Sequence, residues 1–167
     1  MSDLLSSAAS RADEQPLERT FRLVNGADPG LTLRVLWQGP SDPQMRVERG
    51  VFARASRFAS GPATLRVRIL GDAALAQVWG TGGAEALEVV PSLIGERDDP
   101  APLVARHPIV ADVQRRLPGL RLTSGAPVYE TLLVSILSQK ITSFEARRSF
   151  AGLVRRFGER APGPLGL

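Results

Sequence analysis

The chain has 167 residues, 43% of them hydrophobic, which is enough for one good core or two small ones. Its 21 basic and 17 acidic side chains leave a net charge of +4, which permits an anionic partner without demanding one. The absence of cysteine excludes disulfides, thiolate nucleophiles and cysteine-bound metal centres, and no apolar run reaches the roughly 18 residues that a membrane span needs.

The first 18 residues are polar and rich in serine and alanine, so we expect residues 1–18 to form a flexible tail. They lack the basic start and apolar run of a secretory signal peptide. A cytoplasmic location is therefore expected.

Residues 19–80 are predicted to form short antiparallel strands. The alternation of apolar and polar side chains places them at 31–37, near Met45 and Val47, and at 51–55, 65–69 and 74–79. Turns are expected near Gly50 and at Gly71-Asp72, and Gly61-Pro62 is expected to break the chain between strands.

A helix over 84–94 is predicted to follow Gly82-Gly83 and to pack on the sheet, with Pro91 as the point where it could bend. Together with the strands it makes an α+β domain over residues 19–95. The fold class is therefore α+β, an antiparallel sheet with a packed helix, followed by an all-helical segment.

The helical segment is predicted over residues 96–160. Asp99, with a proline after it, predicts a short helix toward Arg106. We interpret His107 as a helix boundary, because the next residue is the proline that begins another helix, and Pro118-Gly119 stops that helix.

Residues 128–157 are predicted to form two amphipathic helices joined by a short polar elbow at 139–141. The second helix opens with a capping box, in which Thr142 and Glu145 exchange hydrogen bonds, and Gly158 ends it. The first helix carries an apolar stripe at three- and four-residue steps, formed by Tyr129, Leu132, Leu133, Ile136 and Leu137.

The polar residues of this helix pair suggest a grip on a nucleic-acid backbone. Gln139 and Lys140 lie at the elbow, where neither helix buries them. Four arginines lie away from the apolar stripe: Arg147, Arg148, Arg155 and Arg156. Lys140 is the only lysine of the chain. Since an arginine could have supplied a generic positive charge, the lysine indicates that a compact point charge is required at this position. The alternative is that these charges are simply solvated, as most surface arginines on helices are.

The run 136–142, Ile-Leu-Ser-Gln-Lys-Ile-Thr, and the later run 153–159, Leu-Val-Arg-Arg-Phe-Gly-Glu, resemble a known family. It is the 3-methyladenine-type DNA glycosylases of the helix-hairpin-helix superfamily. The segment 106–122 resembles the part that precedes the helix pair in that family. The resemblance covers roughly residues 20–165 and is most specific from 106 to 160.

This resemblance implies a base-excision-repair enzyme that hydrolyses the N-glycosidic bond of alkylated bases, such as 3-methyladenine, in duplex DNA. The elbow would supply the wedge that fills the gap left by a flipped base. The expected DNA-binding residues are Gln139, Lys140, Thr142, Arg147 and Arg148. Lys140 could act as the wedge, as a phosphate contact, or as both. No metal and no other cofactor is expected.

Two parts of the family pattern are absent from the sequence: the glycine-rich hairpin and the catalytic aspartate. The Pro/Gly-rich segment 161–167 is expected to be the start of an interdomain loop that has been truncated. Glu130 and Glu145 are expected on helix surfaces, and the aspartates in capping or solvated roles, so no residue of this chain is predicted to be catalytic.

The first hypothesis is therefore a fragment or truncated relative of a nucleoid-associated bacterial glycosylase, which binds damaged double-stranded DNA but does not excise bases. Its uncovered apolar stripe is expected to favour self-association. The alternative is a non-catalytic small DNA-binding or protein-interaction module that reuses the helix pair.

Overall fold

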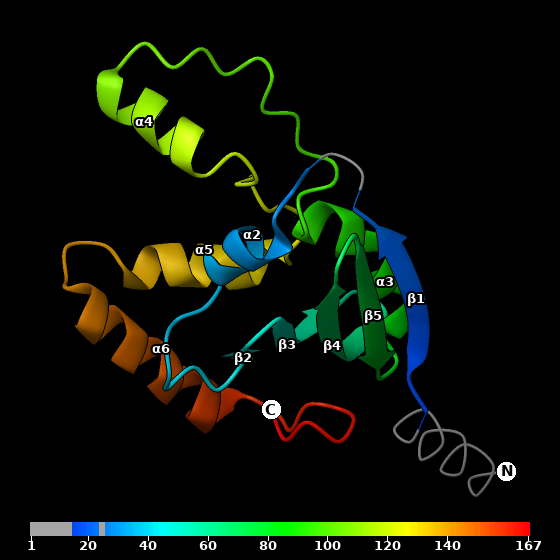
Figure 1. Cartoon of the computed structure of the whole chain (residues 1–167). Helices are drawn as coiled ribbons and strands as arrows, with labels where there is room; N and C mark the ends of the chain where they lie inside the picture. Colours follow the sequence, from blue (N-terminus) through cyan, green and yellow to red (C-terminus); the bar gives the residue numbers. More distant parts are fainter. Residues whose placement is uncertain (1–14, 24–25) are drawn as a thin grey trace, which may run out of the picture.

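The computed structural model describes residues 15–23 and 26–167, as a five-stranded antiparallel sheet combined with helices (Figure 1). The α+β class predicted from the sequence is confirmed. The elements are β1 (Leu17–Arg22), α2 (Pro29–Arg34), β2 (Met45–Glu48), β3 (Val51–Phe58), β4 (Gly61–Leu70), β5 (Ala73–Trp79), α3 (Gly83–Leu93), α4 (Pro108–Arg116), α5 (Val128–Leu137) and α6 (Ser143–Phe157).

The sheet has the strand order β1-β5-β4-β3-β2, so four consecutive strands form hairpins and β1 closes the other edge beside β5. The predicted hairpin turn at Gly50 is confirmed, and Gly50 has a φ of 69°, a conformation that an L side chain rarely adopts. Gly61-Pro62 does not break the chain between strands, because the turn lies just before it and both residues pair with β3 at the start of β4.

β1 begins at Leu17, so the last two residues of the predicted tail are strand. Residues 1–14 of that tail lie outside the described residues. Within the part of the chain that the structure describes, none of the helices combines the length and the apolar character needed to cross a membrane.

The core lies between one face of the sheet and α3. In β4, Leu65 and Val67 are buried on this face while Arg66 and Arg68 alternate onto the other, as predicted. α3 contributes Leu87 and other apolar side chains to the same cluster, which confirms that it packs on the sheet. The fully or nearly buried members include Leu33, Met45, Phe52, Val78, Val90, Leu93 and Ile94.

The strand predicted at 31–37 is wrong, because the chain forms the short helix α2 there. Asp28 caps the helix: its Oδ1 accepts from the backbone N–H of Gly30 at 2.8 Å and of Leu31 at 3.2 Å, and Pro29 occupies the first turn. Leu33 turns into the core with 3% of its surface exposed. The alternation of leucines was therefore outweighed by an Asp-Pro helix start.

The short helix predicted after Asp99 is also absent. Asp99 Oδ1 does accept from the backbone N–H of Ala101 at 3.0 Å, but the chain continues without regular structure to His107. Pro102 accounts for this, since a proline disfavours helical backbone at the residue before it. α4 then begins as predicted, with His107 Nδ1 accepting from Ile109 N–H at 3.3 Å.

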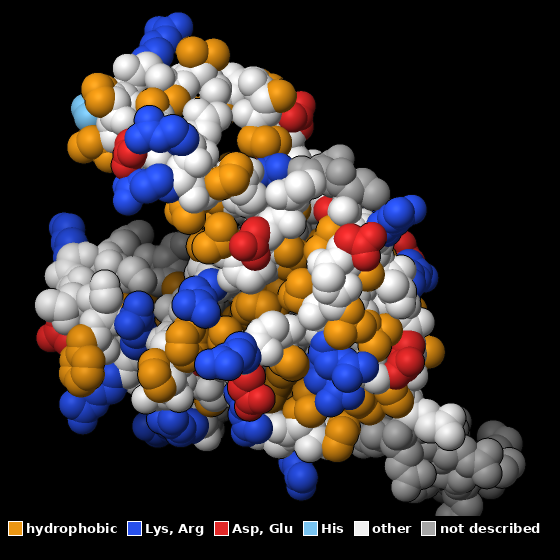
Figure 2. Space-filling model, viewed as in Figure 1, with side chains coloured by type: hydrophobic (Ala, Val, Ile, Leu, Met, Phe, Trp, Pro, Cys, Tyr) orange, Lys and Arg blue, Asp and Glu red, His pale blue; other side chains and the backbone are white. Residues whose placement is uncertain are grey.

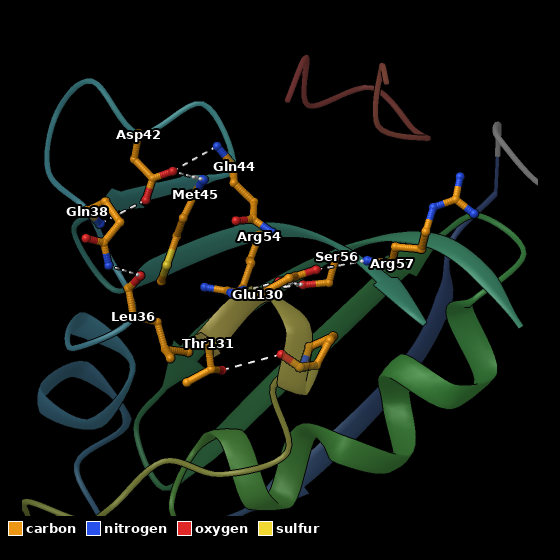
Figure 3. A network of polar contacts seen from close by, with 11 residues as sticks. Leu36, Gln38, Asp42, Gln44, Met45, Arg54, Ser56, Arg57, Glu130 and Thr131 are labelled. Carbon is orange, nitrogen blue, oxygen red and sulfur yellow. Dashed lines mark hydrogen bonds and ion pairs between the residues drawn. The ribbon is translucent and has the colours of Figure 1, made fainter. Parts of the chain in front are cut away.

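The segment 161–167, predicted as a loop, packs against the sheet face opposite α3. Figure 3 shows it and α3 on opposite sides of the strands. Arg46 of β2 donates to the carbonyls of Leu165 and Gly166, both at 2.7 Å. Gly163 lies so close to Trp79 that an added Cβ would be 2.5 Å from the indole Cγ. Both faces of the sheet are therefore covered here, and Trp79 is 3% exposed.

We predict that Asp28→Ala lowers the free energy of unfolding by about 1 kcal/mol, because two N–H groups at the start of α2 lose their acceptor. Urea denaturation followed by circular dichroism measures the change. Asp72→Ala is the matched control, since the Asp72 carboxylate is exposed and lies 3.9 Å from its nearest cation. Equal stability of the two variants would contradict the capping role.

Candidate nucleic-acid interface

α5 and α6 form a helix pair whose elbow points away from the sheet (Figure 1). α5 starts after Pro127 and ends at Ser138, whose N–H donates to Val134 O at 3.0 Å. α6 starts after Thr142 and ends at Gly158. The two helices and the tight elbow predicted from the sequence are therefore confirmed, with the elbow spanning residues 138–142.

Lys140 has a φ of 58° and is the only non-glycine residue with a positive φ among those that the structure describes. A left-handed conformation costs an L residue about 1–2 kcal/mol, and such strain is concentrated at functional sites. The side chains of Gln139, Lys140 and Ile141 are exposed. The elbow therefore presents an amide and an ammonium group to solvent from a fixed, strained backbone.

Thr142 and Glu145 form the predicted capping box. Thr142 Oγ1 accepts from the backbone N–H of Glu145 at 3.3 Å, and both the backbone N–H and the hydroxyl of Thr142 donate to Glu145 Oε2, at 2.9 and 2.7 Å. These hydrogen bonds, the backbone one foremost, lower the pKa of Glu145. Thr142, expected as a DNA contact, thus has a structural role, because its hydroxyl holds the start of α6.

α6 rests on the loop before β2 through its arginines. Asp42 stiffens this loop by accepting three backbone N–H groups, at 2.8 to 3.1 Å (Figure 3). Arg155 donates to Ser41 O at 3.2 Å, and Arg147 passes alongside Gly39, where an added Cβ would lie 3.6 Å from its Nη1. Two of the arginines that were expected to face solvent therefore also dock the helix.

The basic side chains of the helix pair are all accessible to solvent. Arg147 and Arg148 are exposed, as is Lys140 at the elbow. Figure 2 shows basic side chains spread along the helix pair and over the sheet, mixed with apolar ones rather than gathered in one patch. The structure therefore places Gln139, Lys140 and Arg148 where a polyanion could reach them.

The apolar stripe of α5 is largely uncovered. Tyr129 is 74% exposed, Leu132 53% and Ile136 54%, and no residue of α5 is fully buried. α6 buries Phe150 more deeply, at 3% exposure. The helix pair thus offers apolar surface in addition to its charges.

Glu130 was expected on the helix surface, and the structure corrects this. Its side chain is 13% exposed and its Oε2 lies 2.8 Å from Nη2 of Arg54, whose side chain is also 13% exposed. The same oxygen accepts from Ser56 Oγ at 3.0 Å, and Oε1 accepts from the backbone N–H of Arg57 at 3.0 Å (Figure 3). Glu130 therefore ties α5 to β3.

A signal for this tie was present in the sequence of β3. Phe52, Arg54 and Ser56 are two residues apart, so they share the face that carries the apolar core. An arginine on an inward face needs an anionic partner, because an unpaired buried charge is costly. Looking for that partner among the downstream acids would have identified Glu130 as a candidate.

A cavity of about 380 Å³ lies between the helix pair and the ends of β3 and β4. Its walls are mainly apolar, and at its rim the Arg57 guanidinium pairs with Glu159. The apolar lining residues include Tyr129, Leu133, Phe150, Val154, Phe157 and Pro162.

The aspartates of the helical segment make structural contacts, and for Asp98 the contact differs from the expected capping or solvated role because its partner lies 24 positions away. Asp98 Oδ2 accepts from Leu122 N–H at 2.9 Å, and Asp112 pairs with Arg115 at 2.5 Å and Arg116 at 2.6 Å. Over residues 15–23 and 26–167, no group of three or more acidic or histidine side chains is arranged to hold a metal ion.

The fold resembles a solved structure, the 3-methyladenine DNA-glycosylase from Archaeoglobus fulgidus, with a TM-score of 0.68 and 19% sequence identity. The match covers 89% of this chain and 53% of that chain, so this chain spans about half the length of the structure that it matches. At this identity the likeness shows the fold alone. No protein-family model matches the sequence, and no curated protein matches it.

We predict that the contribution of Glu145 to stability is lost in acid. Its pKa is lowered in the folded state from an ordinary value of 4.5, so the contribution is complete above pH 4.5 and disappears as the pH falls through the lowered value. Urea midpoints of the wild type and Glu145→Gln, measured from about pH 6 to about pH 3, should therefore converge as the pH falls. The control is Glu48→Gln at an exposed position of β2. A constant gap between wild type and Glu145→Gln would refute the capping argument.

Proposed function

We propose that this chain belongs to the DNA-binding part of a base-excision-repair DNA N-glycosylase for alkylated bases such as 3-methyladenine. The observation that carries the proposal is the exposed elbow, in which Lys140 is held at a φ of 58° between two helices. The likeness to the archaeal 3-methyladenine DNA-glycosylase structure supports it, since 89% of this chain shares that fold.

In this proposal the elbow enters duplex DNA where a damaged base has left the stack. Unstacking costs a few kcal/mol, which the protein offsets by filling the gap and holding the bent backbone. The aliphatic stem of Lys140 fits a stacked gap while its ammonium group reaches a phosphate, and Gln139 offers an amide to base edges or sugar. Arg147 and Arg148 would contact phosphates farther along the strand.

Thr142 acts indirectly in this scheme. Its hydroxyl and backbone are engaged with Glu145, so it fixes where α6 begins and hence where the elbow ends. The Glu145 carboxylate already occupies this helix start, so in this proposal a phosphate is bound by the Lys140 ammonium group rather than by the first turn of α6.

Hydrolysis of a glycosidic bond needs a carboxylate that can stabilise positive charge on the sugar or activate water. The two carboxylates of the helix pair are engaged otherwise: Glu130 by β3, and Glu145 by the capping box. We therefore propose that residues 1–167 bind damaged DNA without cutting it.

We predict that Gln139→Ala combined with Lys140→Ala weakens binding to a duplex with an abasic-site analogue about tenfold and lowers the salt slope by about 1, because one phosphate contact is lost. Fluorescence anisotropy at several salt concentrations measures both quantities. Arg22→Ala is the matched control, since Arg22 is an exposed arginine of β1. An equal loss in the control, or no loss in the double variant, would remove the elbow from the interface.

We predict that purified residues 1–167 release no 3-methyladenine from alkylated duplex DNA, because neither carboxylate of the helix pair is available for the reaction. Chromatography of the released bases measures this, with an active alkylbase glycosylase as the positive control. Release of 3-methyladenine above the rate in buffer would show the assignment of Glu130 and Glu145 to be wrong.

The second candidate is a non-catalytic interaction module. The exposed Tyr129, Leu132 and Ile136 favour it, because contiguous apolar surface commonly marks an interface or causes self-association. The salt series separates the two candidates: DNA affinity that falls steeply with salt supports the first, and affinity that is absent at low salt supports the second.

A further inference from the structure

We propose that Glu130 is a positioning residue, which sets the place of the elbow relative to the sheet by fixing α5 on β3. Three donors from one strand meet its carboxylate: Arg54 Nη2 at 2.8 Å, Ser56 Oγ at 3.0 Å and the backbone N–H of Arg57 at 3.0 Å (Figure 3). Its consequence for DNA binding rests on the proposed function, but the geometric claim does not.

Because Glu130 lies near the start of α5, a small tilt of the helix at this residue displaces the elbow at its other end. Glu130 is the third residue of α5, and Lys140 follows ten residues later. α5 continues for seven residues beyond Glu130, about 10 Å at 1.5 Å per residue, so a tilt of about 10° at Glu130 moves the start of the elbow by about 2 Å. A shift of that size is enough to misplace an ammonium group relative to a phosphate.

Apolar packing holds α5 only in part, through the half-buried Leu133, Val134 and Leu137. No residue of α5 is fully buried, and its large side chains at Tyr129, Leu132 and Ile136 are more than half exposed. The Glu130–Arg54 pair, with both side chains 13% exposed, is a well-shielded polar contact between this helix and the sheet. Shielding from water strengthens such a pair and makes its geometry specific.

The other end of the helix pair is tied to the same region of the sheet. After α6, Glu159 pairs with the Arg57 guanidinium. The backbone N–H of the same Arg57 donates to Glu130 Oε1. Arg46 then holds the carbonyls of Leu165 and Gly166. The start of α5 and the segment after α6 are thus both bonded to the sheet, and the elbow is the end of the helix pair that lies away from it.

Distance measurement between two spin labels tests the positioning claim without DNA. Because the chain has no cysteine, labels at Gln139→Cys and Thr20→Cys report the elbow and the sheet alone. We expect a narrow distance distribution in the protein that carries only the two labels. When Arg54→Met and Glu130→Met are added together, the distribution should become broader or shift. The paired change keeps the side-chain volume and leaves no unpaired buried charge, so the protein still folds.

Thr131→Ala is the matched control on the same helix, because the Thr131 hydroxyl bonds only within α5, to Pro127 O at 3.4 Å. It should leave the distribution unchanged. A distribution that stays narrow in the Arg54→Met, Glu130→Met protein would overturn the proposal.

A second arm, without labels, measures affinity for the abasic-site duplex with and without Lys140→Ala. In the native background Lys140→Ala should weaken binding about tenfold, and in the Arg54→Met, Glu130→Met background it should have little further effect. The full Lys140→Ala effect in both backgrounds would overturn the claim that Glu130 acts through the elbow. Absence of DNA binding in the wild type, with a distance change as expected, would overturn the proposed function and support the tie.

Discussion

A largely buried ion pair joins the helix pair to the sheet. Arg54 lies on the inward face of β3, where a charge without a partner would be costly, and Glu130 is the partner that reaches it, at 2.8 Å. Because the carboxylate also accepts from Ser56 and from the backbone of Arg57, three donors of one strand constrain how α5 approaches it. The direction of α5, and hence the place of the elbow, follows from this pairing.

The sheet is a firm support for that pairing. α3 and the core cover one face, and the segment 161–167 covers part of the other through Trp79 and Arg46. A strand that is packed on both sides has little freedom to shift, so the groups on β3 that bind Glu130 are held in place. The strain at Lys140 is maintained by the same rigidity, since the two helices that flank the elbow determine its backbone.

Local signals in the sequence predicted those parts that local interactions decide. The hairpin at Gly50, the capping box of Thr142 and the end of α6 at Gly158 each depend on residues within four positions of one another. α2 was mistaken for a strand because six residues are too few to distinguish a helical period from alternation, and the Asp-Pro start was the better signal. The tie of Glu130 to β3 and the docking of 161–167 join residues more than 70 positions apart. The local pattern of β3 indicates that Arg54 needs an anionic partner, but it does not select which downstream acid supplies it.

The central claim is that a strained elbow, held by Glu130 and β3, enters duplex DNA. Backbone amide shifts of the ¹⁵N-labelled chain, recorded during titration with an abasic-site duplex, test it most directly. The account predicts that the largest shifts fall on residues 138–142 and the first turn of α6, with small shifts over β4 and β5. Largest shifts on the sheet face around Arg66 and Arg68, with the elbow unchanged, would contradict it.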